Sequence, residues 1–519
     1  MLVHVIGAKC VGIDAVKVTV ELEITFGIGI HLVGLADIAV KESLMRTTTA
    51  LQSLGFKIPG KRIVINLAPA DLHKKGSGYD LPIAIGILTA SEQCKLPQIG
   101  RYVIMGELGL NGEVRDITGA LSIAEMARSE GLAGCIFPLG SALETVEFRD
   151  IDIYGVRTVH DALRILSGEG DCSDLLVWNT PEYRKYREER PLVTERPGTI
   201  MDFADIIGQE GAKRGVEIAA SGAHNLLLIG PPGAGKSSIA KALSGILPEM
   251  TIEESILTSK IYSIAGKGDL KYGLVKQRPF RAPHYSASMA AIIGGGAGDC
   301  IYPGEVSLAQ NGVLFLDEFG QMPKSVIEAL RGPIEDRKVT VSRLRAKVVF
   351  PASFMLVAAS NPCPCGFYGD GDRCTCTPAQ RNQYLSRLSG PIMDRLDLHI
   401  WMKPVNSLRM VSRRKAESSR VIAERVLRAR EMQKDRFKGE RIFANAEMDN
   451  RLIEKYCPLD KACQDTMATL LSTMNLSMRA FFRIIKVART IADLEGDSDI
   501  LPKHLMEAAS FRALDRSKM

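Results

Sequence analysis

Residues 230–237 read G-P-P-G-A-G-K-S and carry the clearest chemistry of the chain. An apolar run before them predicts a strand, and residues 238–247 predict a helix. A loop of this form binds phosphate, because its backbone N–H groups surround the anion at a helix N-terminus. We expect Lys236 to contact the β- and γ-phosphates of ATP and Ser237 to bind Mg²⁺. The expected nucleotide-binding residues are Gly230, Pro231, Pro232, Gly233, Ala234, Gly235, Lys236, Ser237 and Ser238.

Two apolar runs further along end in polar residues that would complete such a site. Asp317 and Glu318 follow one run, and Asn361 follows the other. Parallel sheets place their ligands at the C-terminal ends of strands. We expect Asp317 to hold Mg²⁺ and Glu318 to act as general base on the attacking water. Asn361 would orient a water beside the γ-phosphate, although alone it would indicate only a capped turn.

Two arginines extend this set. Arg395 lies between short acids just before a predicted strand, and Arg479 lies near the start of a predicted amphipathic helix. Arg395 could form an internal ion pair, or it could be an arginine finger that reaches the ATP of a neighbouring subunit. Arg479 alone is typical of a solvated residue, but in a domain that covers the nucleotide it could contact phosphate.

Four of the eleven cysteines form two C-x-C pairs in residues 363–376. Four thiolates within reach of one centre suit tetrahedral Zn²⁺. The alternative is four reduced thiols in a polar loop. With four protein ligands the zinc would be structural, and it would stiffen a loop close to Asn361. These cysteines are Cys363, Cys365, Cys374 and Cys376.

The segments that must position these residues differ in their hydrophobic patterns, and so in the secondary structure that we predict for them. Residues 1–170 alternate strands, predicted at 16–24 and 61–67, with helices, including a buried helix at 82–90. We expect an α/β protein in which a P-loop core follows this first domain and a linker. The predicted domains are 1–170, a proline-rich charged linker at 171–200, a nucleotide-binding core at 201–403 that contains the cysteine loop, and a helical domain at 404–519.

The composition of the chain excludes some classes of protein. The chain has 519 residues, of which 46% are hydrophobic and 24% charged, and its net charge is +6. No uncharged apolar run is long enough to predict a membrane span. The first residues lack the pattern of a signal peptide, so a cytoplasmic location is expected. The mildly basic charge permits a nucleic-acid partner without requiring one.

Taken in order, the P-loop, the acidic strand, the Asn strand, the arginine and the C-terminal helices resemble an AAA+ ATPase. Longer motifs are similar to the magnesium-chelatase-like ComM/YifB family over essentially the whole chain. That resemblance implies a ring-forming, hexameric ATPase and, in the ComM branch, a DNA helicase that drives branch migration in recombination. It also implies that Asn361 is sensor 1, Arg395 the trans-acting finger and Arg479 sensor 2. The matching segments are R-P-F-R-A-P-H-Y-S at 278–286, P-G-E-V-S-L-A-Q-N-G-V-L-F-L-D-E-F at 303–319 and A-S-N-P-C-P-C-G at 359–366.

The first domain resembles the proteolytic domain of Lon-type proteases at residues 76–84 and 106–119. Lon chemistry needs a serine nucleophile and a lysine base. In this chain Asp80 stands at the serine position and Leu121 at the lysine position. We therefore expect no peptidase activity, and a scaffolding or substrate-contacting role instead.

Two basic segments are candidates for DNA contact. Residues 337–347 hold five Lys or Arg and no acid, and strand periodicity would place Arg343, Arg345 and Lys347 on one face. The family suggests that such a hairpin points into the pore of a ring. Residues 408–441 hold twelve basic and five acidic residues, and they predict either a DNA-binding helix or a solvated face.

These observations favour an ATP-driven motor on single-stranded or branched DNA. A magnesium-chelatase-type motor that acts on a tetrapyrrole and a protein-remodelling ATPase are the alternatives. A protease is disfavoured because the Ser–Lys pair is missing.

Overall fold

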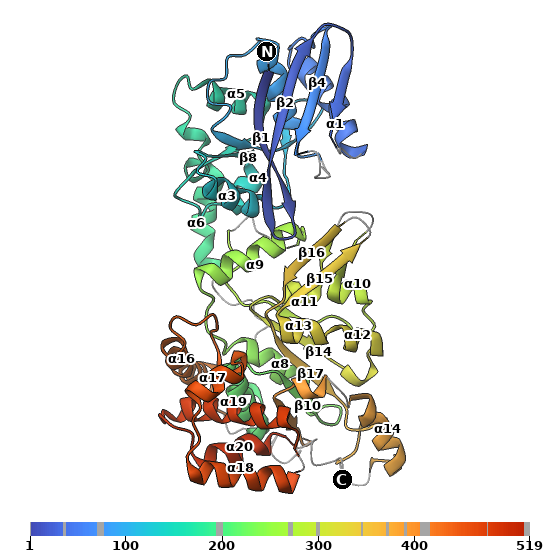
Figure 1. Cartoon of the computed structure of the whole chain (residues 1–519), viewed down its shortest axis with the longest axis vertical. Helices are drawn as coiled ribbons and strands as arrows, with labels where there is room; N and C mark the ends of the chain where they lie inside the picture. Colours follow the sequence, from blue (N-terminus) through green and yellow to red (C-terminus); the bar gives the residue numbers. More distant parts are fainter. Residues whose placement is uncertain are drawn as a thin grey trace. The chain divides into compact units, whose positions relative to one another are not determined.

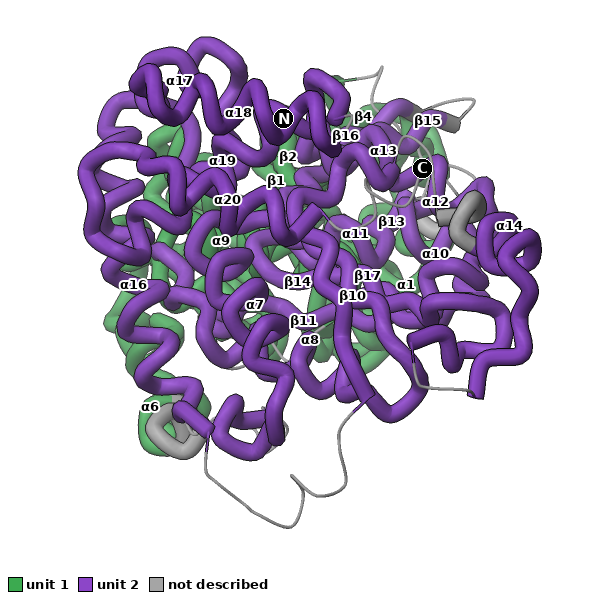
Figure 2. Tube along the Cα trace, turned by 90° about the horizontal axis from the view of Figure 1, so that it is seen from below, with its two compact units in different colours: residues 1–195, 252–275 green, residues 196–251, 276–519 purple. Residues whose placement is uncertain are grey.

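The computed structural model describes residues 2–34, 38–69, 77–193, 201–267, 273–296, 301–343, 346–369, 373–388, 392–404, 416–474 and 476–512. Contacts divide the chain into two compact units, which Figure 2 shows in different colours. Unit 1 comprises Met1–Glu195 and Ile252–Val275, and unit 2 comprises Arg196–Thr251 and Lys276–Met519. The segment Ile252–Val275 thus packs with unit 1, although it lies between the P-loop and the acidic strand in sequence.

The main sheet in the described part of unit 1 has the strand order β3-β4-β2-β1-β5-β8-β9 (Figure 1). β1, β2 and β4 are antiparallel neighbours, and the other adjacent pairs are parallel. The strands predicted at 16–24 and 61–67 are confirmed, and alternate residues of β4 are buried. The bounds are β1 Leu2–Val11, β2 Asp14–Thr25, β3 Ile30–Val33, β4 Arg62–Ala68, β5 Tyr102–Ile104, β8 Gly134–Pro138 and β9 Asp152–Val156, with a separate pair β6 Glu107–Leu108 and β7 Val114–Arg115.

Helices pack against this sheet. Every residue of α2 (Asp80–Ala90) is buried, which confirms the buried helix predicted from its apolar sequence. α6 (Pro181–Val193) lies where the sequence predicted a linker. Pro181 occupies its first position, and the Glu, Arg and Lys residues that follow are good helix formers. The remaining helices of unit 1 are α1 Ile38–Ser53, α3 Ala120–Ser129, α4 Leu139–Glu144, α5 Val159–Ser167 and α9 Ile252–Ile264.

Polar contacts fix α9 within unit 1. The buried Lys260 donates hydrogen bonds to Asp14 Oδ1 (3.0 Å) and Glu125 Oε2 (2.6 Å). The Ser263 hydroxyl donates to Glu144 Oε2 at 2.8 Å. Burial raises the pKa of Glu144 to about 7. Tyr262 packs against the hydrophobic core of unit 1. The helix is therefore an integral part of unit 1.

Unit 2 is built on a parallel sheet with the order β11-β14-β17-β10-β18 among its described residues. All residues of β10, β14 and β17 are buried, as expected for a parallel sheet covered on both faces. This α/β arrangement agrees with an AAA+-like domain. The bounds are β10 Leu226–Ile229, β11 Phe280–Arg281, β14 Val313–Leu316, β17 Met355–Ser360 and β18 Leu398–Trp401, with the hairpins β12 Gly294–Gly295 with β13 Tyr302–Pro303 and β15 Lys338–Arg343 with β16 Ala346–Pro351.

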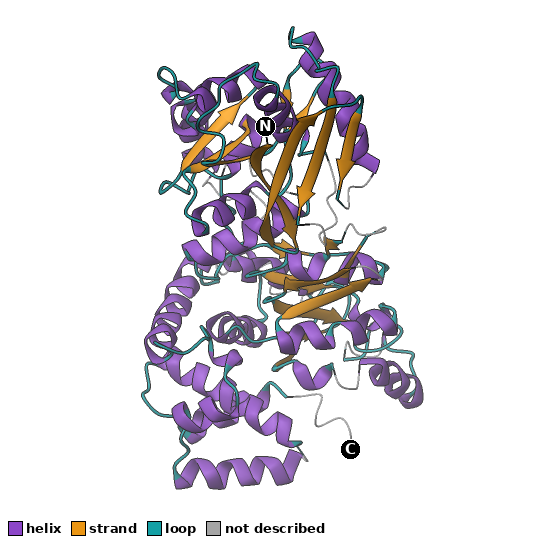
Figure 3. Cartoon of the chain, turned by 45° about the horizontal axis from the view of Figure 1, so that its top comes forward, coloured by secondary structure: helices purple, strands orange, loops and turns teal. Residues whose placement is uncertain are grey.

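The end of the chain in unit 2 is helical, as Figure 3 shows by colour. These helices share a hydrophobic core with the parallel sheet and with α7 (Glu210–Gly222). No helix of the described residues is both long enough and apolar enough to cross a membrane. The other α-helices in the described part of unit 2 are α8 Lys236–Ser244, α10 Met289–Ile293, α11 Glu305–Leu308, α12 Lys324–Ala329, α13 Arg331–Asp336, α14 Pro378–Leu388, α16 Ser419–Arg436, α17 Asn450–Tyr456, α18 Lys461–Met474, α19 Met478–Glu495 and α20 Pro502–Ser510.

Candidate functional site

The glycine-rich loop lies between β10 and α8, as the sequence predicted. β10 ends at Ile229, and α8 begins at Lys236 with Gly235 as its N-cap. Gly233 and Gly235 have φ values of +78° and +89°, in the left-handed region that favours glycine. A Cβ at either position would meet nothing within 4 Å. Backbone conformation, and not lack of space, therefore requires glycine here.

Lys236 is directed toward oxygen atoms at the mouth of this loop. Its ammonium donates hydrogen bonds to Gly230 O (2.6 Å), Pro231 O (3.1 Å) and Asn361 Oδ1 (3.1 Å). Burial lowers the pKa of Lys236, while Asp317 and Glu318 oppose that shift. A phosphate would give this partly desolvated cation a full counter-charge, which the two carbonyls cannot provide.

Oxygen ligands suited to Mg²⁺ meet beside Lys236. The Ser237 hydroxyl donates to Asp317 Oδ2 at 3.0 Å, and Asp317 Oδ1 accepts the Glu318 amide at 2.9 Å. A hydroxyl and a carboxylate are ligands that Mg²⁺ accepts alongside substrate phosphates, so this donor set fits the metal. Glu318 has φ +50°, an uncommon left-handed conformation for a non-glycine residue. Such strain is concentrated at functional sites.

The two predicted arginines lie at the other edge of the parallel sheet. Arg395 precedes β18, whose first residue pairs with Leu226 at the start of β10. The P-loop follows the last residue of β10, and four residues at about 3.3 Å each put the two edges about 13 Å apart. Arg395 Nη2 forms an ion pair with Glu335 Oε1 at 2.6 Å, and the arginine side chain is 7% exposed. The structure does not bring Arg395 to its own P-loop.

Arg479 lies next to Arg395 in space. Its side chain is 66% exposed, and its guanidinium is 3.4 Å from the carboxylate of Asp394. Arg483 on the same helix pairs with the buried Asp397. Burial alone would raise the pKa of Asp397, but Arg483 and His224 outweigh it and hold that pKa well below its ordinary value. α19 is thus anchored to the edge of the sheet opposite the P-loop.

The four cysteines converge as the sequence predicted, with sulfur atoms all within 4.8 Å of one another. The Cys363–Cys374, Cys365–Cys374 and Cys363–Cys365 sulfur distances are 3.8, 3.7 and 3.3 Å. Ligands at 2.3 Å from a tetrahedral zinc would lie about 3.8 Å apart, which the first two distances match and the third falls short of. A backbone hydrogen bond from Phe367 lowers the pKa of Cys365 to about 6, whereas burial and the neighbouring thiols raise the pKa of Cys376 to about 11.

A second group of potential ligands was not foreseen from the sequence. Glu495, Asp497 and His504 place their ligand atoms within 4.8 Å of one another. The Lys503 ammonium already lies 2.6 Å from Glu495 and 3.1 Å from Asp497. A lysine cation therefore balances these acids, and the group has a structural explanation.

The basic hairpin forms, but its faces differ from the prediction. The register pairs Ser342 with Lys347 and position 343 with Ala346. Lys347 therefore shares its face with Ser342, and the prediction that it shares a face with Arg343 is wrong. The prediction carries one strand periodicity across residues 344 and 345, whereas β15 ends at 343 and β16 begins at 346. Arg345 lies outside the described residues.

The exposed face of this hairpin is mostly polar and carries two lysines. Lys338, Thr340, Ser342 and Lys347 are exposed, and Val349, which pairs with Thr340, is exposed beside them. Val339, Val341, Val348 and Phe350 are buried on the other face. The exposed face thus offers two ammonium groups and two hydroxyls, all suited to phosphate oxygens.

The second basic segment is partly neutralised within unit 2. On α16, Arg425 contacts Glu417 at 2.6 Å and Glu217 at 2.5 Å. Arg436 pairs with the buried Asp493. These arginines attach α16 to its neighbours, which favours the structural interpretation for them. Residues 408–415 of the segment lie outside the described residues.

In unit 1 the position compared with the Lon serine carries an ion pair. The fully buried Asp80 accepts hydrogen bonds from Arg46 Nε at 3.0 Å and from the Leu108 amide at 3.1 Å. Leu121, at the position compared with the lysine, is fully buried in α3. Asp80 therefore holds Arg46 in an ion pair, and Leu121 is part of the hydrophobic core of unit 1.

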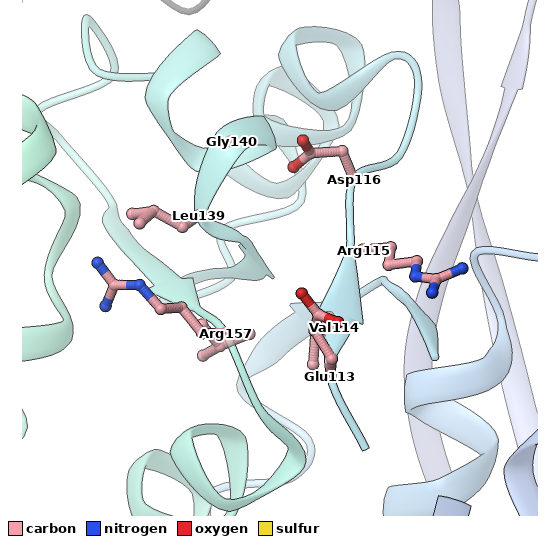
Figure 4. A pocket seen from close by; sticks show the side chains of 8 residues that line it. Glu113, Val114, Arg115, Asp116, Leu139, Gly140 and Arg157 are labelled. Carbon is pink, nitrogen blue, oxygen red and sulfur yellow. The ribbon is translucent and has the colours of Figure 1, made fainter. Parts of the chain in front are cut away.

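A pocket of about 320 Å³ lies elsewhere in unit 1 (Figure 4). Figure 4 shows the carboxylate of Asp116 beside Gly140, whereas the side chain of Arg115 is directed away from Gly140. Asp116 accepts a hydrogen bond from the Ser141 amide at 2.9 Å and so fixes the start of α4. Neither a serine nor a lysine lines this pocket. Its residues are Glu113, Val114, Arg115, Asp116, Leu139, Gly140, Val156 and Arg157.

Comparison with known families covers most of the chain. The family described as subunit ChlI of Mg-chelatase matches residues 20–141. The family described as magnesium chelatase, subunit ChlI, matches residues 202–410, and that of the ChlI C-terminal region matches residues 416–512. The second match contains the P-loop, the acidic strand, the Asn strand and Arg395.

Relatives align along nearly the whole length. "Uncharacterized protein YifB" of Salmonella typhimurium is 42% identical over 509 residues, 97% of this chain and 96% of the relative. "Competence protein ComM" of Haemophilus influenzae is 42% identical over 517 residues, with the same coverage of both chains. "DNA replication licensing factor Mcm6" of Drosophila melanogaster is 27% identical over 338 residues, 61% of this chain and 37% of the relative. The chain therefore belongs to the magnesium-chelatase-like ComM/YifB family of AAA+ ATPases.

Proposed function

We propose that this protein is an ATP-driven DNA motor that works as a ring of identical subunits, a hexamer in the form that the family suggests. The observation that carries the proposal is the division of the candidate site. Lys236, Ser237, Asp317 and Asn361 lie at one edge of the parallel sheet, whereas Arg395 and Arg479 lie at the other. A second copy that presents its arginine edge to the P-loop of the first would complete the site.

In this mechanism the residues of one chain bind and orient ATP. Lys236 exchanges its carbonyl partners for the β- and γ-phosphates, and Asn361 turns its amide to the attacking water. Mg²⁺ held by Ser237 and Asp317 would neutralise phosphate charge. Glu318 accepts the proton of the water. Arg395 leaves Glu335 and stabilises the charge that develops on the γ-phosphate of the neighbouring site.

DNA as the track is supported by the relatives and by the hairpin. One relative is named for competence and another for DNA replication licensing. The exposed face of β15 and β16 presents Lys338, Thr340, Ser342 and Lys347. Phosphate contacts of this kind position a strand without reading its sequence. Binding should therefore tolerate any sequence and weaken with salt.

The test uses a four-way DNA junction, the branched substrate that a branch-migration motor would move. Wild-type protein should hydrolyse ATP faster with the junction than without it, and should resolve the junction into duplexes. Lys236→Ala should fail at nucleotide binding, and Glu318→Gln should bind ATP and junction without movement. Equal ATPase rates with and without DNA, together with an unmoved junction, would end the DNA-motor proposal.

The family descriptions also favour a magnesium-chelatase-type motor that acts on a tetrapyrrole. Stimulation of ATP hydrolysis by a porphyrin, in the absence of DNA, would support this second function. The same phosphate-release assay therefore separates the two functions.

We also propose roles for the remaining parts. Cys363, Cys365, Cys374 and Cys376 would hold one structural Zn²⁺, since two of their sulfur distances match those of a tetrahedral site. Residues 1–170 would be a Lon-like domain without peptidase activity, because Asp80 and Leu121 occupy the positions of its serine and lysine. Residues 404–519 would form a helical lid. Casein degradation by the purified protein would contradict the assignment of the first domain.

A further inference from the structure

The cysteine loop is in direct contact with the phosphate-binding loop. Gly366 lies between the two C-x-C pairs, and its amide donates to Cys363 O at 3.0 Å in a tight turn. Its φ of +85° is in the left-handed region. A Cβ at this position would lie 3.1 Å from Cδ of Pro232. Glycine is needed for both reasons, and the turn rests against the P-loop.

A second contact joins the cysteine loop to the strand beside the P-loop. The ring of Tyr368 packs edge-on against Trp401, with centroids 6.2 Å apart. The guanidinium of Arg381 lies 4.3 Å from the centroid of the Tyr368 ring. Trp401 ends β18 and pairs with Ile229, the residue just before the P-loop. The loop therefore touches two of the segments that frame the nucleotide site.

A third connection runs through Asn361, which precedes Cys363 by two residues. Its side chain accepts a hydrogen bond from Lys236 at 3.1 Å. Cys363 is buried, and the other three cysteines are half-buried. The ligand cluster thus fixes the chain close to the residue that meets the P-loop lysine. A small loop without a large apolar core takes its order mainly from such a cluster.

We propose that the metal bound by the four cysteines sets the affinity of the P-loop for nucleotide. This inference rests on the zinc site proposed above. With a thiophilic divalent cation bound, the cysteine loop supports Pro232 through Gly366 and keeps Asn361 beside Lys236. Without the metal, both supports are lost and nucleotide binds more weakly. The coupling is reciprocal, so bound nucleotide must tighten metal binding by the same factor.

The first test needs no change to the cysteines. The full-length protein with Trp178→Phe keeps Trp401 as its only tryptophan. Zinc content is measured by emission spectrometry, and zinc affinity by competition with a chelator, with and without ADP. We expect one zinc per chain, and an affinity about tenfold higher with ADP. Removal of zinc should also shift the emission of Trp401, and added zinc should reverse the shift.

Two variants distinguish the effect of the metal on nucleotide affinity from the effect of the contact between Gly366 and Pro232. Cys374→Ser with Cys376→Ser removes two ligands far from Asn361 in sequence, and should lose zinc and bind a fluorescent ATP analogue about tenfold more weakly. Gly366→Ala keeps all four thiols, so it should retain zinc yet also bind the analogue more weakly. Cys94→Ser, at a half-buried cysteine of unit 1, is the matched control and should change neither measurement.

The failures can be told apart. A wild-type protein that contains no zinc would remove the metal site and this inference, while the ATPase proposal would stand. The second failure is a protein that contains one zinc but binds it with the same affinity with and without ADP, and whose Gly366→Ala variant binds the analogue normally. This result would leave the zinc site in place and overturn the coupling.

Discussion

Two inactive variants, Lys236→Ala and Arg395→Ala, should recover ATP hydrolysis when they are mixed in one assembly. Each variant lacks one half of the candidate site. Lys236 lies at the C-terminal edge of the parallel sheet, and Arg395 lies at the opposite edge in an ion pair with Glu335. In a ring, the intact Arg395 of a Lys236→Ala chain would face the intact Lys236 of an Arg395→Ala neighbour.

The size of the recovery follows from this geometry. With equal amounts of both variants, half of the sites carry Lys236 and half of these face an intact Arg395, so about a quarter of the sites are complete in a closed ring. Loss of an arginine finger alone costs about 10³-fold or more in rate. A site built within one chain would give no recovery, because every chain lacks one of the two residues.

The assay is steady-state phosphate release at saturating ATP. The variants carry different affinity tags, and two successive purifications isolate assemblies that contain both. The matched control mixes Lys236→Ala with a chain that carries both substitutions, and no site in it is complete. If the isolated mixed assemblies are no faster than this control, the reasoning that divides the site between two chains is refuted.

Three further outcomes follow from the structure. Glu318→Gln should bind ATP normally but hydrolyse it about 10²- to 10⁴-fold more slowly, as binding and phosphate-release assays would show. Lys338→Ala with Lys347→Ala should lower DNA affinity and reduce the salt slope of binding by about 1 to 2, measured by anisotropy, with the exposed Lys324→Ala as control. Burial raises the pKa of Glu144 from 4.5 to about 7, so the folded state binds more protons than the unfolded state between these values and stability falls as pH rises through them. Glu144→Gln should therefore add up to about 3 kcal/mol of unfolding free energy at pH 8 and almost none at pH 4, measured by denaturant titration; an equal gain at both pH values would show that the ionisation of Glu144 is not the cause.

Local patterns were enough to place the nucleotide edge of the sheet. The glycine-rich loop lies between a strand and a helix, and the acidic and Asn runs are adjacent strands. Because parallel strands end at one edge, the contacts of Ser237 with Asp317 and of Lys236 with Asn361 could be anticipated. The cysteine cluster could be anticipated too, since its ligands lie close together in sequence.

Contacts between distant residues could not be read from such patterns. The partner of Arg395, Glu335, is sixty positions earlier, and nothing in the sequence marks it. The hairpin itself was predicted, but its faces were not, because Leu344 and Arg345 are not typical turn residues and one strand periodicity was carried across them. The assignment of α9 to unit 1 depends on Asp14 and Glu125, which are far from it along the chain.

The place of α9 has consequences for synthesis and for truncation. The core of unit 1 lacks this helix until residue 275 has been made, so unit 1 cannot finish folding on the ribosome before the P-loop has also emerged. A shortened chain that begins at residue 196 would keep α9 while losing the hydrophobic core against which Tyr262 packs. The two units are therefore interlaced in sequence, and a single cut cannot separate them cleanly.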